Sequence, residues 1–290
     1  FPVRNEVRGM SDMAHLLEME NLTKDFGGIR AVDSLTCSVN EGSITGIIGP
    51  NGAGKTTVFN LITGVYRPTT GDIRFEGASI VGNRPDVIVG KGVTRTFQNI
   101  RLFNRRTCLE NVMTPLLQRT ACPLLSALLR TPRARRVDRN ARAKAMSLLV
   151  AMGIESYADA KASTLPYGLQ RKLEIARALA AEPKLLLLDE PAAGMNPEET
   201  RSLADLIARV HADFNVTILL IEHHMDLVMN ICSPVIVMNF GALLAEGRPD
   251  EVRADERVIG AYLGRKKRDG KESAAPEGAE GEDRHAGARR

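Results

Sequence analysis

The segment from residue 49 to residue 56 constrains this chain more than any other. It reads Gly-Pro-Asn-Gly-Ala-Gly-Lys-Thr, which matches the pattern GxxxxGK[ST], and it directly follows the apolar run Ile44–Ile48. The glycines let the backbone curl until its N–H groups point at phosphate oxygens, and the helix expected over Thr56–Ile62 adds the positive end of its dipole. The sequence therefore predicts a strand, a phosphate-binding loop and a helix, in that order.

Two side chains of the loop point to a nucleoside triphosphate bound with Mg²⁺. Lys55 is expected to reach the β- and γ-phosphates, and the Thr56 hydroxyl is expected to hold the metal ion. We predict that the nucleotide is bound by the loop as a whole, namely Gly49, Pro50, Asn51, Gly52, Ala53, Gly54, Lys55, Thr56 and Thr57.

A second motif pairs an apolar run with two carboxylates. Leu185–Leu188 ends in Asp189 and Glu190, and in open α/β sheets ligands bind at the carboxyl ends of the strands. Asp189 is predicted to bind Mg²⁺ through water, and Glu190 to polarise an attacking water as a general base. On their own these carboxylates could form a solvated acidic turn, but the phosphate loop favours the functional interpretation.

The apolar runs indicate the fold class. Ile218–Ile221 and Val235–Met238, like the two runs above, lack alternating polar residues, which is typical of parallel strands covered on both faces. Amphipathic patterns over Lys172–Ala181 and Glu198–Ala212 lie between the runs and predict helices. Strands and helices in this order predict an α/β layered fold.

The stretch from residue 99 to residue 164 differs from the rest. It carries no strand signal, and its helical patterns, Leu109–Leu117 and Ala141–Met152, are expected to be broken by Pro115, Pro123 and Pro132. We interpret it as a helical insertion. The basic stretch Arg130–Lys144 within it most simply forms a solvated helix face, and contact with anionic lipid is the alternative.

Composition excludes several classes of protein. The net charge of +4 is too small for a dedicated nucleic-acid binder, and the four cysteines form no CxxC pair that would suggest a zinc site. No apolar run approaches the roughly 18 to 20 residues that span a bilayer. The first ten residues lack the apolar core of a signal peptide; Met10 and Met13 are candidate starts. Residues 265–290, without Leu, Ile, Val or Phe, are expected to be disordered.

The segment Leu165–Leu179, Leu-Pro-Tyr-Gly-Leu-Gln-Arg-Lys-Leu-Glu-Ile-Ala-Arg-Ala-Leu, resembles the signature of ABC-transporter ATPases, usually LSGGQ followed by a run that ends in IARAL. The resemblance covers about residues 16–264. It implies that Gln98 joins the Mg²⁺ site to the helical insertion, that His223 contacts the γ-phosphate, and that Phe26 lies under the adenine. It also implies that Gly168 meets the ATP of a partner subunit, and it puts Asn196 where an aspartate is usual.

Three segments are similar, more narrowly, to the ATPase subunits of branched-chain amino acid importers: Arg171–Arg177, Asp189–Pro197 and Val258–Gly264. This resemblance implies a second ATPase subunit in a heterodimer, two membrane-spanning permease subunits and a periplasmic substrate-binding protein. The chain would bind ATP and Mg²⁺ at the cytoplasmic face of the inner membrane, and no nucleic acid. Urea or amide import, lipid or lipopolysaccharide export and, less favoured, a soluble non-transport ATPase remain alternatives.

The resemblance also implies how the chain is divided. The expected units are a flexible N-terminus at 1–14, a β subdomain with the phosphate loop at 15–98, the helical subdomain with the signature at 99–182, the rest of the core at 183–247, a short helical extension at 248–264 and the tail at 265–290. Two signature positions depart from the family pattern: Pro166 replaces the usual serine and Leu169 the usual glutamine. Both departures weaken the expected contact of this signature with a partner's γ-phosphate.

Overall fold

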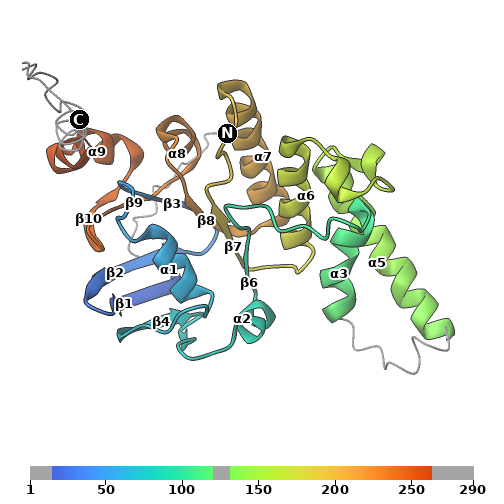
Figure 1. Ribbon diagram of the computed structural model, residues 1–290, viewed down its shortest axis with the longest axis horizontal. Coiled ribbons are helices and arrows are strands. Elements are labelled where there is room, and N and C mark those ends of the chain that lie inside the picture. The colour runs from blue at the N-terminus through green and yellow to red at the C-terminus, as the bar shows by residue number, and fades with distance from the viewer. Residues whose placement is uncertain (1–14, 120–130, 263–290) are drawn as a thin grey trace, which may run out of the picture.

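Two β-sheets organise the part of the chain that this computed structural model describes, residues 15–119 and 131–262 (Figure 1). The predictions for 1–14, for Pro123, for Arg130 and for the tail lie outside the described residues. Within them, no helix is both long and apolar enough to cross a bilayer. The expected division into units stays a prediction.

The central sheet has six strands in the order β10-β9-β3-β8-β7-β6. The pairs from β9 across to β6 are parallel, and β10 is antiparallel to β9. The four strands that the sequence predicts are confirmed as β3, β7, β8 and β9. The bounds are β3 Ile44–Ile48, β6 Val93–Arg95, β7 Leu185–Asp189, β8 Thr217–Ile221, β9 Val235–Asn239 and β10 Ala242–Gly247.

The apolar runs are continuous because both faces of this sheet are buried. In β7, Leu186 and Leu188 pack into one apolar cluster with the helices α3, α5, α6 and α7, whereas Leu185 and Leu187 pack into a second one on the other face. Successive side chains of a strand point to opposite faces. A strand covered on both faces therefore needs an apolar residue at every position.

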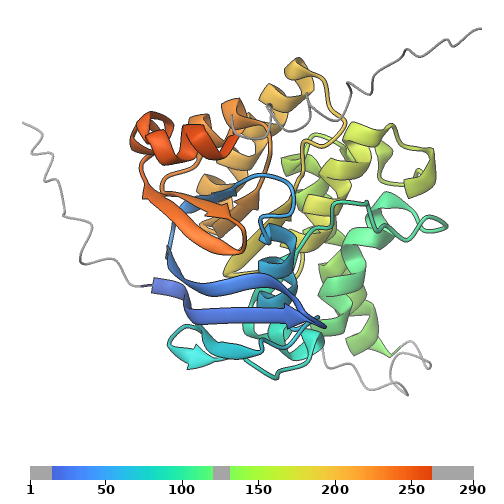
Figure 2. The same ribbon diagram turned by 60° about the vertical axis from the view of Figure 1, so that its left-hand side comes forward.

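The second sheet is antiparallel, in the order β2-β1-β4-β5, and Figure 2 shows it below the C-terminal elements. Helix α1 joins the two sheets: the buried ring of Phe59 shares one cluster with Leu17 of β1 and Leu187 of β7. The strands that the resemblance implies near the N-terminus are thus present, and they form an antiparallel sheet. The bounds are β1 His15–Phe26, β2 Ile29–Asn40, α1 Lys55–Ile62, β4 Thr70–Phe75, β5 Ala78–Ser79 and α2 Pro85–Lys91.

In the inserted region, at the right of Figure 1, the regular elements of the described residues 99–119 and 131–164 are helices. Pro132 is the first residue of α5, where its missing N–H costs nothing, and Thr131 caps the helix by accepting from the Ala134 amide. The prediction that Pro115 breaks a helix is wrong: it lies inside α3, which the burial of Leu109 and Val112 stabilises. The bounds are α3 Cys108–Arg119, α5 Pro132–Ala151, η1 Glu155–Tyr157, η2 Ala162–Thr164 and α6 Tyr167–Leu179.

Helix α5 starts nine residues before the predicted Ala141, and residues 132–144 of the basic stretch lie in its N-terminal part. The cations of this half are exposed, which fits a solvated face: Arg133, Arg135, Arg136, Arg139, Arg142 and Lys144.

The remaining helices are α7 Pro197–Phe214, α8 Met225–Ile231, α9 Pro249–Ala254 and a short helix at 256–262. Asn196 caps α7: its side chain accepts from the amides of Glu198 and Glu199, while the Glu199 carboxylate accepts from the Asn196 amide.

Candidate active site

Four neighbouring parallel strands deliver most of the predicted site residues to one edge of the central sheet. The phosphate loop follows β3, the segment with His223 follows β8, Asp189 ends β7 with Glu190 directly after it, and the segment with Gln98 follows β6. Parallel strands end at the same edge, so residues that are distant in the chain meet there.

The phosphate loop needs its glycines for close approach. Gly54 has φ +96°, and a Cβ there would lie 2.3 Å from the carbonyl oxygen of Ala31. The Lys55 ammonium is buried and donates to the carbonyl oxygens of Gly49 (2.7 Å) and Pro50 (3.0 Å). A hollow of about 360 Å³ opens beside the loop, lined by Ile29, Arg30, Ala31, Asn51, Gly52, Ala53, Gly54, Lys55, Thr56, Thr57, Glu190 and His223.

The Glu190 carboxylate is held between two of the predicted residues. Its Oε2 accepts from the Gln98 amide at 2.7 Å, and its Oε1 lies 2.6 Å from His223 Nε2. Its backbone has φ +46°, in the left-handed region that non-glycine residues adopt uncommonly. Glu190 is therefore fixed at the rim of the hollow, where it can orient a water and accept its proton.

Asp189 has a partner that sequence reasoning missed. Arg95 Nη2 lies 2.5 Å from Asp189 Oδ2, and both side chains are almost completely buried. Arg95 also donates to Asn60 (2.7 Å) and lies over the rings of Phe59 and Phe97. Burial raises the pKa of the Asp189 carboxyl, and the Arg95 guanidinium opposes this rise.

Replacing Arg95 by Met should lower the free energy of unfolding by about 3 to 5 kcal/mol at pH 7, because the Asp189 charge would stay buried without its cation. The pKa of Asp189 should then rise further. A carboxyl whose pKa is raised in the folded state makes the protein less stable as the pH rises. The loss of unfolding free energy caused by Arg95→Met should therefore shrink as the pH falls toward 5. Urea unfolding at several pH values measures this. A deficit that does not change with pH would contradict the argument.

Glu222 is a second residue beside the site that the sequence did not single out. It is buried, and its Oε1 accepts from the Ala192 amide at 2.7 Å while its Oε2 accepts from the His223 amide at 2.9 Å and faces His224 Nδ1 at 3.2 Å. It thereby ties the turn after β7 to the turn after β8. The sequence signal was an acidic residue directly after an apolar strand.

The residues present fit a nucleotide with Mg²⁺. The loop runs so close to neighbouring backbone that a Cβ at Gly49 or Gly54 would meet Met238 O at 2.2 Å or Ala31 O at 2.3 Å, so glycine is needed for its curled path beside the hollow. Thr56 is exposed beside the hollow. Hydroxyl and carboxylate oxygens, such as those of Thr56 and Asp189, are the donors that Mg²⁺ prefers.

The structure places Ile29, and not the predicted Phe26, in the lining of the hollow. Phe26 is 40% exposed, packs edge-on against Tyr66 with 5.1 Å between ring centroids, and is not among the residues that line the described hollow. Ile29 does line it and is 74% exposed. The contact of Phe26 with adenine stays a prediction, with Ile29 as an apolar neighbour that no motif marks.

The signature glycine is not part of this hollow either. Gly168 lies in the first turn of α6, where a Cβ would meet nothing within 4 Å, and Leu169 packs against the apolar core. Tyr262, the last residue that the structure describes, reaches the phosphate loop. Burial raises the pKa of its hydroxyl, and a hydrogen bond with the Gly49 backbone opposes the rise.

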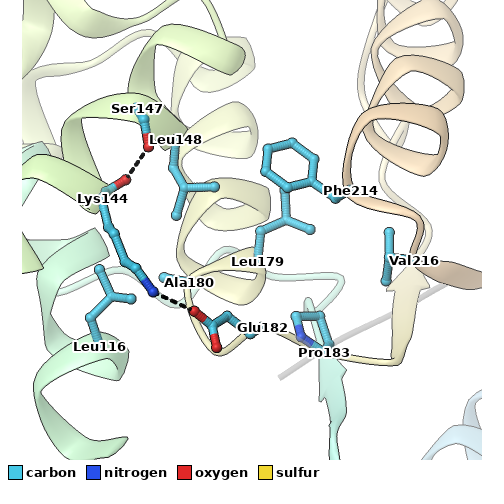
Figure 3. A pocket seen from close by; sticks show the side chains of 10 residues that line it. All are labelled: Leu116, Lys144, Ser147, Leu148, Leu179, Ala180, Glu182, Pro183, Phe214 and Val216. Atoms are coloured by element: carbon cyan, nitrogen blue, oxygen red, sulfur yellow. Dashed lines mark hydrogen bonds and ion pairs between the residues drawn. The ribbon is translucent and has the colours of Figure 1, made fainter. Parts of the chain in front are cut away.

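A separate hollow of about 330 Å³ lies between the helices (Figure 3). Leu148, Leu179 and Phe214 line it, and at its edge Lys144 Nζ lies 2.8 Å from Glu182 Oε1. Because its lining residues Glu182 and Pro183 precede β7 and Val216 precedes β8, it lies at the end of these strands opposite to the carboxylates.

Comparisons with known proteins agree with this geometry. Residues 32–193 match the family model described as ABC transporter, and residues 242–267 match that of the branched-chain amino acid ATP-binding cassette transporter. The chain is 47% identical over 249 residues to the high-affinity branched-chain amino acid transport ATP-binding protein BraF of Pseudomonas aeruginosa, and 45% identical to LivG of Escherichia coli. Both matches cover 86% of this chain and 98% of the relative.

Solved structures agree as well. A nucleotide-free ATP-binding cassette from an ABC transporter superposes with a TM-score of 0.73 at 33% identity, covering 86% of this chain and 99% of that one. A cassette in its ADP conformation gives 0.74 at 33% identity, covering 87% and 99%. With this fold, this site and these similarities, the chain belongs to the ABC transporter family as one of its ATP-binding cassettes.

Proposed function

We propose that this ABC ATPase powers the import of branched-chain amino acids through membrane-spanning partners. The observation that carries the hydrolytic part is the Glu190 carboxylate, held between Gln98 and His223 beside the phosphate loop. The names of the relatives support the substrate class.

In the proposed mechanism Lys55 binds the β- and γ-phosphates, and the loop amides with the N-terminus of α1 bind the phosphate oxygens. Glu190 would orient the attacking water and accept its proton, and His223, whose Nε2 lies 2.6 Å from Glu190 Oε1, would contact the γ-phosphate from the lining of the hollow. Thr56, Asp189 and Gln98 would hold Mg²⁺, which would neutralise charge on the phosphate oxygens.

The full site needs a second cassette in this proposal. Gly168 does not line the hollow, and a Cβ added to it would meet nothing within 4 Å, which leaves room beside it for the ATP of another subunit. We propose a head-to-tail heterodimer with two permease subunits and a periplasmic substrate-binding protein. Such a chain would lie at the cytoplasmic face of the inner membrane without crossing it.

The assembled complex in vesicles tests the substrate class. With the binding protein present, leucine, isoleucine or valine should stimulate ATP hydrolysis at least about threefold, because substrate binding favours closure of the cassettes on ATP. Urea and lipopolysaccharide serve as matched alternatives. Stimulation by one of these, with no response to the branched-chain amino acids, would overturn the substrate while leaving the ATPase intact.

A further inference from the structure

A buried ion pair in α6 lies outside the hollow described above. Arg171 Nη1 lies 2.7 Å from Glu174 Oε2, and the two side chains are 0% and 1% exposed. Desolvating two charges is costly unless their remaining polar atoms find partners. The identity of those partners therefore tells what the pair does.

Both members bind the same stretch of main chain. Arg171 donates to the carbonyl oxygens of Phe97 (2.7 Å) and Gln98 (2.9 Å), and Glu174 Oε1 accepts from the amides of Phe97 (3.4 Å) and Arg101 (3.3 Å). No described helix or strand includes residues 97–101. Side chains of α6 thus supply hydrogen bonds that a sheet or helix would otherwise supply.

This stretch carries the residue that holds the proposed general base. The Gln98 backbone oxygen binds Arg171, while its side-chain amide donates to Glu190 Oε2 at 2.7 Å. A shift of residues 97–101 would move this amide, and a misplacement of about 1 Å in an active site costs up to about 100-fold in rate.

The pair also touches the signature end of the helix. Arg171 Nη2 lies 3.0 Å from the hydroxyl of Tyr167, the residue directly before Gly168, and the guanidinium lies over the Tyr167 ring. The Tyr167 side chain is 44% exposed. A partner cassette that approaches Gly168 would thus meet a residue that contacts the pair.

We propose that Arg171 and Glu174 clamp residues 97–101 and so position Gln98 against Glu190. They are positioning residues, since neither lines the nucleotide hollow. The proposal rests on the proposed ATPase role of Glu190 and adds how the signature helix controls it. Tyr167 is the exposed residue through which a partner cassette would contact this ion pair.

The test measures ATP hydrolysis by the full complex. Arg171→Lys keeps the charge but loses the planar fork that serves several acceptors at once. In Arg171→Lys we expect kcat to fall about 10- to 100-fold, with the KM for ATP within about twofold of the wild type. In Arg171→Met, kcat should fall at least as far. An unchanged kcat in both variants would overturn the clamp.

A double-mutant cycle separates positioning from general destabilisation. If the clamp acts through Gln98, Arg171→Lys should lower kcat less than about twofold further in a Gln98→Ala background. Independent, multiplying losses would overturn the proposal. Leu149→Ala is the matched control: it creates a cavity in α5 of the same region and should lower the melting temperature while leaving kcat within about twofold.

Tyr167→Phe covers the case in which Arg171 variants do not fold, because it removes a single hydroxyl from an exposed ring. It should lower kcat about two- to fivefold, and this loss should vanish in the Gln98→Ala background. A loss that persists there would contradict the clamp. A wild-type complex without ATPase activity would instead contradict the proposed function, so the two failures are distinguishable.

Discussion

Replacing Glu190 by Gln should lower ATP turnover by about 10²- to 10⁴-fold, the usual contribution of a general base, while ATP still binds. The amide has nearly the shape of the carboxylate and can still accept from Gln98, whose Nε2 lies 2.7 Å away. It cannot take a proton from water. The change thus removes the chemistry and keeps the architecture.

Steady-state hydrolysis by the complex and nucleotide binding should be measured on the same preparation. Glu41→Gln is the matched control, because Glu41 is exposed in the turn before β3, at the end of that strand opposite to the phosphate loop. The control should keep full activity. Turnover of Glu190→Gln within about threefold of the wild type would remove Glu190 from the role of base.

The second large effect concerns the inequality of the two ATP sites in a complex of two different cassettes. Lys55→Ala should be far more damaging than the same change in the partner's phosphate loop. Pro166 offers neither hydroxyl nor N–H, α6 has no side-chain cap, and Leu169 packs against the core. The site that depends on this signature retains the Gly168 amide and the helix dipole.

A lost charge-assisted hydrogen bond is worth about 1.5 to 3 kcal/mol, or roughly 10- to 150-fold in rate if it forms fully only in the transition state. Restoring Pro166→Ser with Leu169→Gln should therefore raise turnover at the weak site. Measuring it in a Lys55→Ala background leaves only that site active. Pro166→Ser alone is the control, because it keeps Leu169 and the packing of this side chain against the core. Equal losses from the two lysine changes, without gain from the restored signature, would show that the departures are neutral.

Local patterns were sufficient for the elements that carry the motifs. The phosphate loop is recognised from glycines at fixed positions within eight residues. The strands are recognised from continuous apolar runs, which suit a sheet buried on both faces. Pro115 marks the limit of such reasoning. Proline disfavours a helix locally, but burial of its neighbours on α3 outweighs that preference.

What the sequence alone determined is therefore the order of strands and helices, the phosphate loop and the carboxylates at strand ends. The tertiary structure decided which side chains position these groups. Arg95 binds Asp189, 94 residues further along the chain, and Arg171 binds Gln98, 73 residues before it. No periodic pattern in the sequence predicts such contacts, because they arise where separate strands end at one edge of the sheet and a helix packs beside them. The same packing puts Ile29 in the hollow and leaves Phe26 against Tyr66.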